Sequence, residues 1–215
     1  MKLLLTGFEP FGSSAVNPSE QAARAIGAYG FAGIDLHVAV LPVERLRGPV
    51  ALLTAVEDVR PDAVLCLGEA STRAALAIER VAVNLLDFRI PDNAGEKVQD
   101  QPIVAGGPAA YFSSLPVRAM LDAVRAAGVP AELSLSAGAF LCNQVMYMLL
   151  HFLASNGLAV PAGFIHVPSL PEQAVSTHPA VPPMSLDTTV AGIVAAIGAI
   201  RDDVAAKRQV QYDGG

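Results

Sequence analysis

Short apolar runs of strand length alternate along this chain with longer segments of helical periodicity. The runs are Lys2–Thr6, Asp35–Val40, Ala63–Leu67, Ile78–Leu85, Glu132–Leu135 and Gly163–Val167. Strands and helices that alternate in this way pack as layers, because each element has an apolar surface that another must cover. The pattern therefore predicts an α/β protein built around a mostly parallel sheet.

Helix signals lie between these runs. At Asn17-Pro18-Ser19-Glu20 an N-cap residue precedes a proline at the first helical position, which predicts a helix to about Gly27. Other helices are predicted at 43–59, 115–127 and 143–154, and in a C-terminal segment with apolar residues at helical spacing from 190 to 204. Residues from about 208 to 215 are expected to be frayed.

Two long segments are rich in proline, glycine and other turn residues, at 89–111 and 168–183. Irregular segments of this length in a compact domain are usually functional or mobile. Both segments are therefore expected to border a site.

The 215 residues are predicted to form one domain, 1–215, of which 53% are hydrophobic and 16% charged. So apolar a composition favours self-association. The net charge of −6 and the lack of a Lys/Arg cluster argue against nucleic-acid binding. The apolar N-terminal run is too short for a signal peptide, and no uncharged helical stretch reaches the ~20 residues that span a bilayer. We therefore expect a cytoplasmic protein without membrane contact.

Cys142 lies where a turn of small residues leads into an apolar helical segment. The positive end of a helix dipole favours the thiolate, which is the reactive form of cysteine. Cys142 is therefore a candidate nucleophile, although a single cysteine is more often a buried inert thiol. Cys66 lies in a strand-like run, and no CxxC spacing joins the two, which argues against a zinc site.

Glu79 and His166 are isolated polar residues in apolar, strand-like segments. Alternation places Glu79 on one face with Val81 and Val83, and His166 on one face with Phe164. A buried carboxylate needs a partner, and an ion pair with an arginine is one explanation of Glu79. A satisfied core histidine is the simpler explanation of His166. Together with Cys142, however, the two are the parts of a cysteine-based triad.

Several motifs in order resemble those of the pyroglutamyl peptidases, a family of cytosolic cysteine peptidases. They are Thr6-Gly7-Phe8-Glu9-Pro10-Phe11-Gly12, Ile78-Glu79-Arg80-Val81-Ala82-Val83-Asn84, Arg89-Ile90-Pro91-Asp92-Asn93, Ala137-Gly138-Ala139-Phe140-Leu141-Cys142-Asn143 and Gly163-Phe164-Ile165-His166-Val167-Pro168. The resemblance implies a single-domain, three-layer α/β/α sandwich with a mixed, mostly parallel sheet, and commonly a homotetramer. It also implies removal of an N-terminal L-pyroglutamyl residue from peptides, with no metal or organic cofactor.

By this resemblance Cys142 is the nucleophile, His166 the general base and acid, and Glu79 the carboxylate that orients His166. The positions that match the family's substrate pocket are Phe8, Phe11, Asn17, Glu69, Ile90 and Leu141. Asn17 is equally explained as a helix N-cap. Arg89 is expected to assist the oxyanion or to pair with Glu79, or else to be a solvated loop cation.

One departure concerns Glu69, because the family often has glutamine at that position. An acidic residue there is expected to alter the charge of the pocket and the pH profile if the side chain contacts substrate. Two alternatives stay open. An enzyme of another class, such as a nucleoside phosphorylase, would need a phosphate-binding loop, which the sequence lacks. A catalytically inactive homologue that acts as a binding subunit would lack a selectively reactive Cys142.

Overall fold

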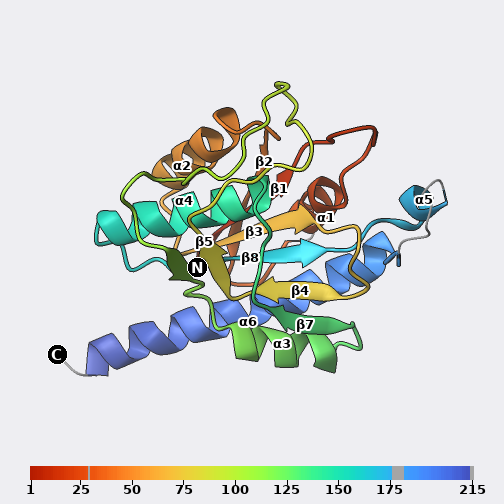
Figure 1. The fold of residues 1–215 in the computed structure, drawn as a ribbon. Helices are drawn as coiled ribbons and strands as arrows, with labels where there is room; N and C mark the ends of the chain where they lie inside the picture. The colour runs from red at the N-terminus through yellow and green to blue at the C-terminus, as the bar shows by residue number, and fades with distance from the viewer. Residues whose placement is uncertain (29, 176–181, 214–215) are drawn as a thin grey trace.

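The computed structural model describes residues 1–28, 30–175 and 182–213. A six-stranded sheet forms its centre, in the order β2-β1-β3-β8-β4-β7 (Figure 1). The strands are β1 (Lys2–Phe8), β2 (Asp35–Leu41), β3 (Ala63–Glu69), β4 (Leu76–Glu79), β7 (Ala131–Ser134) and β8 (Ala162–Val167). The first four in sheet order are parallel, whereas β4 is antiparallel to β8 and parallel to β7. The predicted mixed, mostly parallel sheet is thus confirmed.

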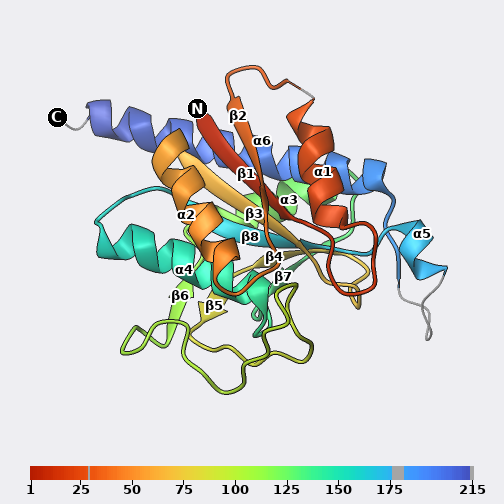
Figure 2. The same ribbon diagram turned by 90° about the horizontal axis from the view of Figure 1, so that it is seen from above.

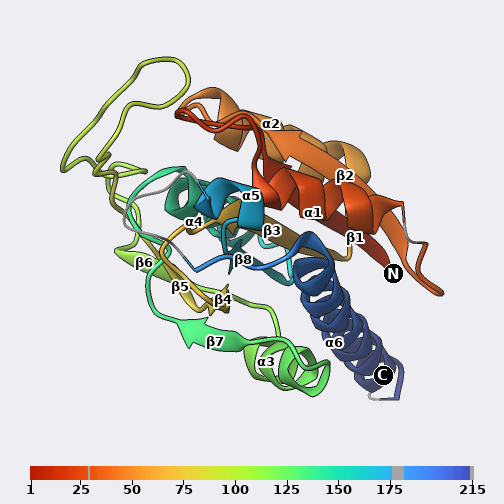
Figure 3. The ribbon, with the colours of Figure 1, turned by 90° about the vertical axis from the view of Figure 1, so that its right-hand side faces the viewer.

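Helices cover both faces of the sheet, as the view in Figure 3 shows. One face is covered by α1 (Pro18–Gly27), α3 (Val117–Ala126) and α6 (Leu186–Asp213), and the other by α2 (Arg47–Val59) and α4 (Leu141–Ser155). Each face encloses its own apolar core, one around Leu5, Leu65 and Ile193 and the other around Phe164 and Met146. This is the expected three-layer α/β/α arrangement, and none of the described helices is long and apolar enough to cross a membrane.

The run predicted as one strand at 78–85 is broken at Arg80. Glu79 ends β4, and β5 (Val81–Val83) leaves the central sheet to pair with β6 (Ala110–Phe112). The carboxamide of Asn143 holds β5 in this place, because it accepts from Val83 N and donates to Val83 O, 2.9 Å each. The expected face shared by Glu79 and Val83 is therefore wrong, although Glu79 is fully buried.

Two predicted helix ends also differ. The second helix begins at Arg47 rather than at residue 43, because Glu9 and Asp92 accept the backbone N–H groups of Val43 and Arg45. The last helix continues to Asp213, where a frayed end was expected from about residue 208, and residues 214–215 lie outside the described part. An ion pair between Arg208 and Asp62 holds this end of α6 against the domain.

The first of the two irregular segments is held in place by its own hydrogen bonds. It forms the long excursion seen in yellow-green in Figure 2. Asp92 Oδ1 accepts from Ala94 N and Glu96 N, and Asn93 Nδ2 donates to Glu9 Oε1 at 2.9 Å. The second segment contains the short helix α5 (Pro171–Ala174), and its residues 176–181 lie outside the description.

Candidate active site

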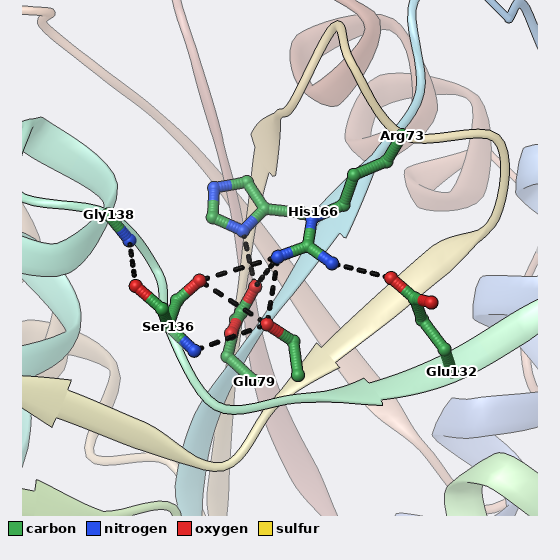
Figure 4. Close-up of polar contacts among 7 residues, drawn as sticks. Arg73, Glu79, Glu132, Ser136, Gly138 and His166 are labelled. Carbon is green, nitrogen blue, oxygen red and sulfur yellow. Dashed lines mark hydrogen bonds and ion pairs between the residues drawn. The ribbon is translucent and has the colours of Figure 1, made fainter.

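Glu79 and His166 come from the adjacent antiparallel strands β4 and β8. Glu79 lies opposite Phe164, two residues before His166, so both side chains project from the sheet face that α4 covers. Their side chains meet, with 2.8 Å between Glu79 Oε1 and His166 Nδ1 (Figure 4). Because an ionised carboxylate only accepts, Nδ1–H donates to it and Nε2 is the basic nitrogen.

Cys142 is the second residue of α4 and is partly buried. Its Sγ lies 2.8 Å from where a Cβ on Gly68 would be, and Gly68 is the register partner of His166 in the neighbouring strand. No side chain caps the start of α4, so its first-turn N–H groups are open to an anion. The fold therefore brings the thiol, the imidazole and the carboxylate to one place on the sheet.

The helix N-terminus does not by itself activate this thiol, contrary to expectation. Burial, followed by the nearby charges of Glu79 and Glu69, raises the pKa of Cys142 to about 12, and the residue's own backbone N–H partly opposes this rise. The backbone N–H at the start of α4 lowers the pKa of the thiol by less than burial and the two carboxylates raise it. A thiol in this setting needs a base to take its proton as it reacts.

A cavity of about 1020 Å³ opens beside Cys142 and His166. The expected pocket residues that line it are Phe8, Phe11, Asn17, Glu69, Arg89, Ile90 and Leu141. Its aromatic wall is extended by Phe140, which the sequence did not single out and whose ring centroid lies 6.3 Å from that of Phe11. Glu79 does not reach the cavity and lies behind His166.

Asn17 and Glu69 are both held by hydrogen bonds within the chain. Asn17 caps α1, since its Oδ1 accepts from Ser19 N at 3.0 Å, and it also lines the cavity. Glu69 Oε1 accepts from Ser169 Oγ at 2.8 Å and from Gln173 Nε2 at 3.2 Å. Burial raises the pKa of the Glu69 carboxyl, and these two hydrogen bonds partly oppose that rise.

The arginine beside Glu79 is Arg73, which sequence reasoning did not select. Its Nη2 lies 3.6 Å from Glu79 Oε1. Arg89, expected as a partner of Glu79, instead lies exposed on the cavity wall and has no ion pair among the residues that the structure describes. Arg73 lies in the loop between β3 and β4, and its side chain reaches Glu79 at the last position of β4.

No cluster of three or more histidine, cysteine, aspartate or glutamate side chains suited to a metal ion occurs in residues 1–28, 30–175 and 182–213. The chemistry available in the site is that of a thiol, an imidazole and a buried carboxylate. These are the groups of nucleophilic acyl transfer.

Comparison with known proteins agrees with this geometry. A family model described as pyroglutamyl peptidase matches residues 1–203. Pyrrolidone-carboxylate peptidase 1 of Ralstonia nicotianae is 50% identical over 198 residues, 91% of this chain and 90% of that protein. A pyrrolidone-carboxylate peptidase of Yersinia pestis is 46% identical over 196 residues, 91% of each chain.

Solved structures lead to the same family. A mutant pyrrolidone carboxyl peptidase from the hyperthermophile Pyrococcus furiosus superposes with a TM-score of 0.91 at 40% identity. The match covers 95% of this chain and 100% of that one. This chain therefore belongs to the pyroglutamyl peptidase family.

Proposed function

We propose that Cys142, His166 and Glu79 carry out the reaction of this cysteine peptidase, the removal of an N-terminal L-pyroglutamyl residue from peptides and amides. The observation that carries the assignment is the 2.8 Å pair of His166 Nδ1 and Glu79 Oε1, which leaves Nε2 as a base beside the cavity that Cys142 also lines. A thiol with a raised pKa needs such a base.

In the first step His166 Nε2 takes the proton of the Cys142 thiol as the sulfur attacks the pyroglutamyl carbonyl carbon. The negative charge that develops on the carbonyl oxygen is stabilised by N–H groups of the first turn of α4, with Arg89 assisting from the cavity wall. The C–N bond then breaks, and His166 gives its proton to the leaving amine. A thioester to Cys142 remains.

In the second step His166 removes a proton from water, which attacks the thioester carbonyl. The C–S bond breaks, the sulfur regains a proton from His166, and pyroglutamate leaves. Glu79 fixes the imidazole in the tautomer with hydrogen on Nδ1 and stabilises the imidazolium formed in both steps. Neither step calls on a metal or an organic cofactor.

The cavity suits a flat lactam ring. Phe8 and Phe11 supply aromatic surface, and Ile90 and Leu141 supply aliphatic surface. Because Asn17 and Glu69 are already hydrogen-bonded within the chain, we assign the two polar atoms of the lactam to backbone N–H and C=O groups of the cavity lining. A residue that is not a lactam would leave these backbone groups without partners, at a cost of roughly 1–3 kcal/mol for each buried group.

The test is release of a chromogenic amine from a pyroglutamyl amide, with the prolyl amide as control. Prolyl amide has the same ring size but a charged ring nitrogen and no lactam carbonyl. We expect turnover of the pyroglutamyl amide alone. No turnover of either amide by folded protein would favour an inactive homologue that acts as a binding subunit, which nothing in the site geometry supports.

We also propose a cytoplasmic homo-oligomer, a homotetramer by resemblance. Large hydrophobic side chains on the surface support self-association, with Phe112 70%, Leu135 68% and Val50 64% exposed in the single chain. Light scattering on the purified protein would measure the mass, and a monomer at micromolar concentration would contradict the proposal.

Gly68→Ala is expected to damage the site without replacing a reacting group. The added Cβ would lie 2.6 Å from Phe164 Cζ and 2.8 Å from Cys142 Sγ, and Phe164 is packed too tightly to withdraw. We expect stability to fall by about 1–3 kcal/mol in denaturant unfolding and kcat to fall at least ~10-fold. Gly198→Ala is the control, because its Cβ would meet nothing within 4 Å. Equal effects of the two changes would contradict the packing argument.

Glu69→Gln is expected to change the pH dependence of stability. Since the pKa of Glu69 is raised in the folded state, the folded chain holds that proton more tightly than the unfolded chain. Stability is therefore lost as pH rises from the unfolded to the folded pKa of Glu69. The variant should be slightly more stable than wild type at neutral pH, by less than ~1 kcal/mol because solvent screens the group, and equal to it in acid.

The same change should also make Cys142 react with iodoacetamide at lower pH, because the charge of Glu69 raises the pKa of the thiol. Thermal unfolding across the pH range and alkylation rates measure the two effects. A variant that is less stable at neutral pH and unchanged in alkylation would contradict this account.

A further inference from the structure

Arg73 joins three parts of the site that lie far apart in sequence. Its Nη2 lies 3.6 Å from Glu79 Oε1 and donates to Ser134 Oγ at 2.9 Å and to the carbonyl of Ser136 at 3.4 Å. Its Nη1 pairs with Glu132 on β7. Figure 4 shows the guanidinium beside the Glu79–His166 pair, with Ser136 on the far side of that pair and Glu132 on the outer side of the guanidinium.

The first consequence is electrostatic. Glu79 is fully buried, and its Oε2 has no hydrogen-bond partner among the described residues. A buried carboxylate in a single hydrogen bond to an imidazole loses most of its hydration, which disfavours the charged form. Among the residues that the structure describes, Arg73 is the arginine or lysine that forms an ion pair with this carboxylate, and its positive charge offsets part of that cost.

The second consequence is geometric. Ser136 lies in the turn between β7 and α4, and its Oγ accepts from Gly138 N at 3.2 Å. Gly138 has a φ of 78°, which favours glycine, and the chain enters α4 three residues later. By binding the Ser136 carbonyl, Arg73 fixes the turn that delivers Cys142 and the first N–H groups of the helix.

We propose that Arg73 is a positioning residue for the peptidase reaction, which holds the Glu79 carboxylate ionised against His166 and braces the turn that leads to Cys142. This inference rests on the roles proposed for those three residues. Two charged or titratable groups face Glu79 directly, His166 and Arg73. Glu132 acts on it through its ion pair with Arg73, and the Cys142 thiol lies near both Glu79 and Glu69.

The test is Arg73→Gln, measured as the pH profiles of kcat and kcat/KM for the pyroglutamyl amide. We expect kcat to fall about 10–100-fold, the loss of one or two charge-assisted contacts at tenfold for each 1.4 kcal/mol. The acidic limb of the profile should move to higher pH, because the positive charge of Arg73 no longer opposes protonation of the site. Arg73→Lys keeps the positive charge but loses the planar guanidinium that binds several acceptors at once, so the acidic limb of this variant's profile should move less.

Three controls separate this role from a structural one. Arg24→Ala removes an exposed arginine that pairs with Glu20 on the surface of α1, and it should leave the profile unchanged. Glu132→Gln removes the exposed partner of Arg73 and should stay within about 2-fold of wild type. Arg73→Ala removes a side chain that lines the cavity. Millimolar guanidinium can then enter the space and should restore part of the lost kcat.

The outcomes distinguish this inference from the proposed function. Inactive wild type refutes the proposed function itself. Active wild type with an unshifted acidic limb in Arg73→Gln refutes the role of Arg73 alone, as does a change confined to KM. An equal shift in Glu132→Gln would assign the effect to the surface network and overturn the role at Glu79.

Discussion

Replacing Cys142 with alanine is expected to lower kcat for a pyroglutamyl amide by on the order of 10⁴-fold or more, to the background rate. The sulfur forms the covalent bond of the proposed mechanism, and the serine and threonine hydroxyls that also line the cavity are weaker nucleophiles. Steady-state kinetics on the folded variant measure the effect. Stability should change little, because the side chain is small and only partly buried.

Cys66→Ala is the matched control for this change. Cys66 is fully buried in β3, and burial raises its pKa to about 12, so it is inert and should be dispensable for turnover. Its loss should cost about 1 kcal/mol of stability through the small cavity left behind. Iodoacetamide should inactivate wild type and Cys66→Ala at the same rate. Wild-type activity in Cys142→Ala, or in fully alkylated protein, would exclude the thiol as nucleophile.

The layered fold could be predicted because its signals are local. Apolar runs of strand length and a proline after Asn17 specify elements from a few neighbouring residues. The reversed direction of β4 and the break at Arg80 could not be predicted in this way. Both depend on partners far along the chain, since Asn143 binds the backbone of Val83 across 60 residues.

The candidate site shows the same division. An acid alone in an apolar run indicates burial, and Glu79 is fully buried. The sequence could not identify Arg73 as the cation beside Glu79, because their proximity follows from the path of the loop between β3 and β4 and not from their spacing along the chain. The pKa of Cys142 was expected to be low from the local helix end, yet it is raised by burial and by two carboxylates from other strands. Local sequence indicates which groups react, whereas their electrostatic setting is a property of the assembled fold.

Glu79→Gln is the second change for which a large effect is expected. The amide keeps the shape of the side chain but removes the charge that stabilises the imidazolium. Its NH₂ group can also turn toward Nδ1 and stabilise the tautomer with hydrogen on Nε2, which cannot act as a base toward the thiol. We expect kcat to fall by roughly 10³–10⁴-fold with a much smaller change in KM, since Glu79 does not line the cavity.

Glu79→Asp tests whether the position of the carboxylate, and not only its charge, is needed for full kcat. The aspartate keeps the charge but is one methylene shorter, so it withdraws from the 2.8 Å contact with His166 Nδ1. Its kcat should lie between those of wild type and Glu79→Gln. Because a neutral amide is easier to bury than a carboxylate, Glu79→Gln should fold with little loss of stability even while Arg73 loses its buried partner. Near wild-type kcat in folded Glu79→Gln would show that the carboxylate does not act through His166, and its 2.8 Å contact would then be only part of the core.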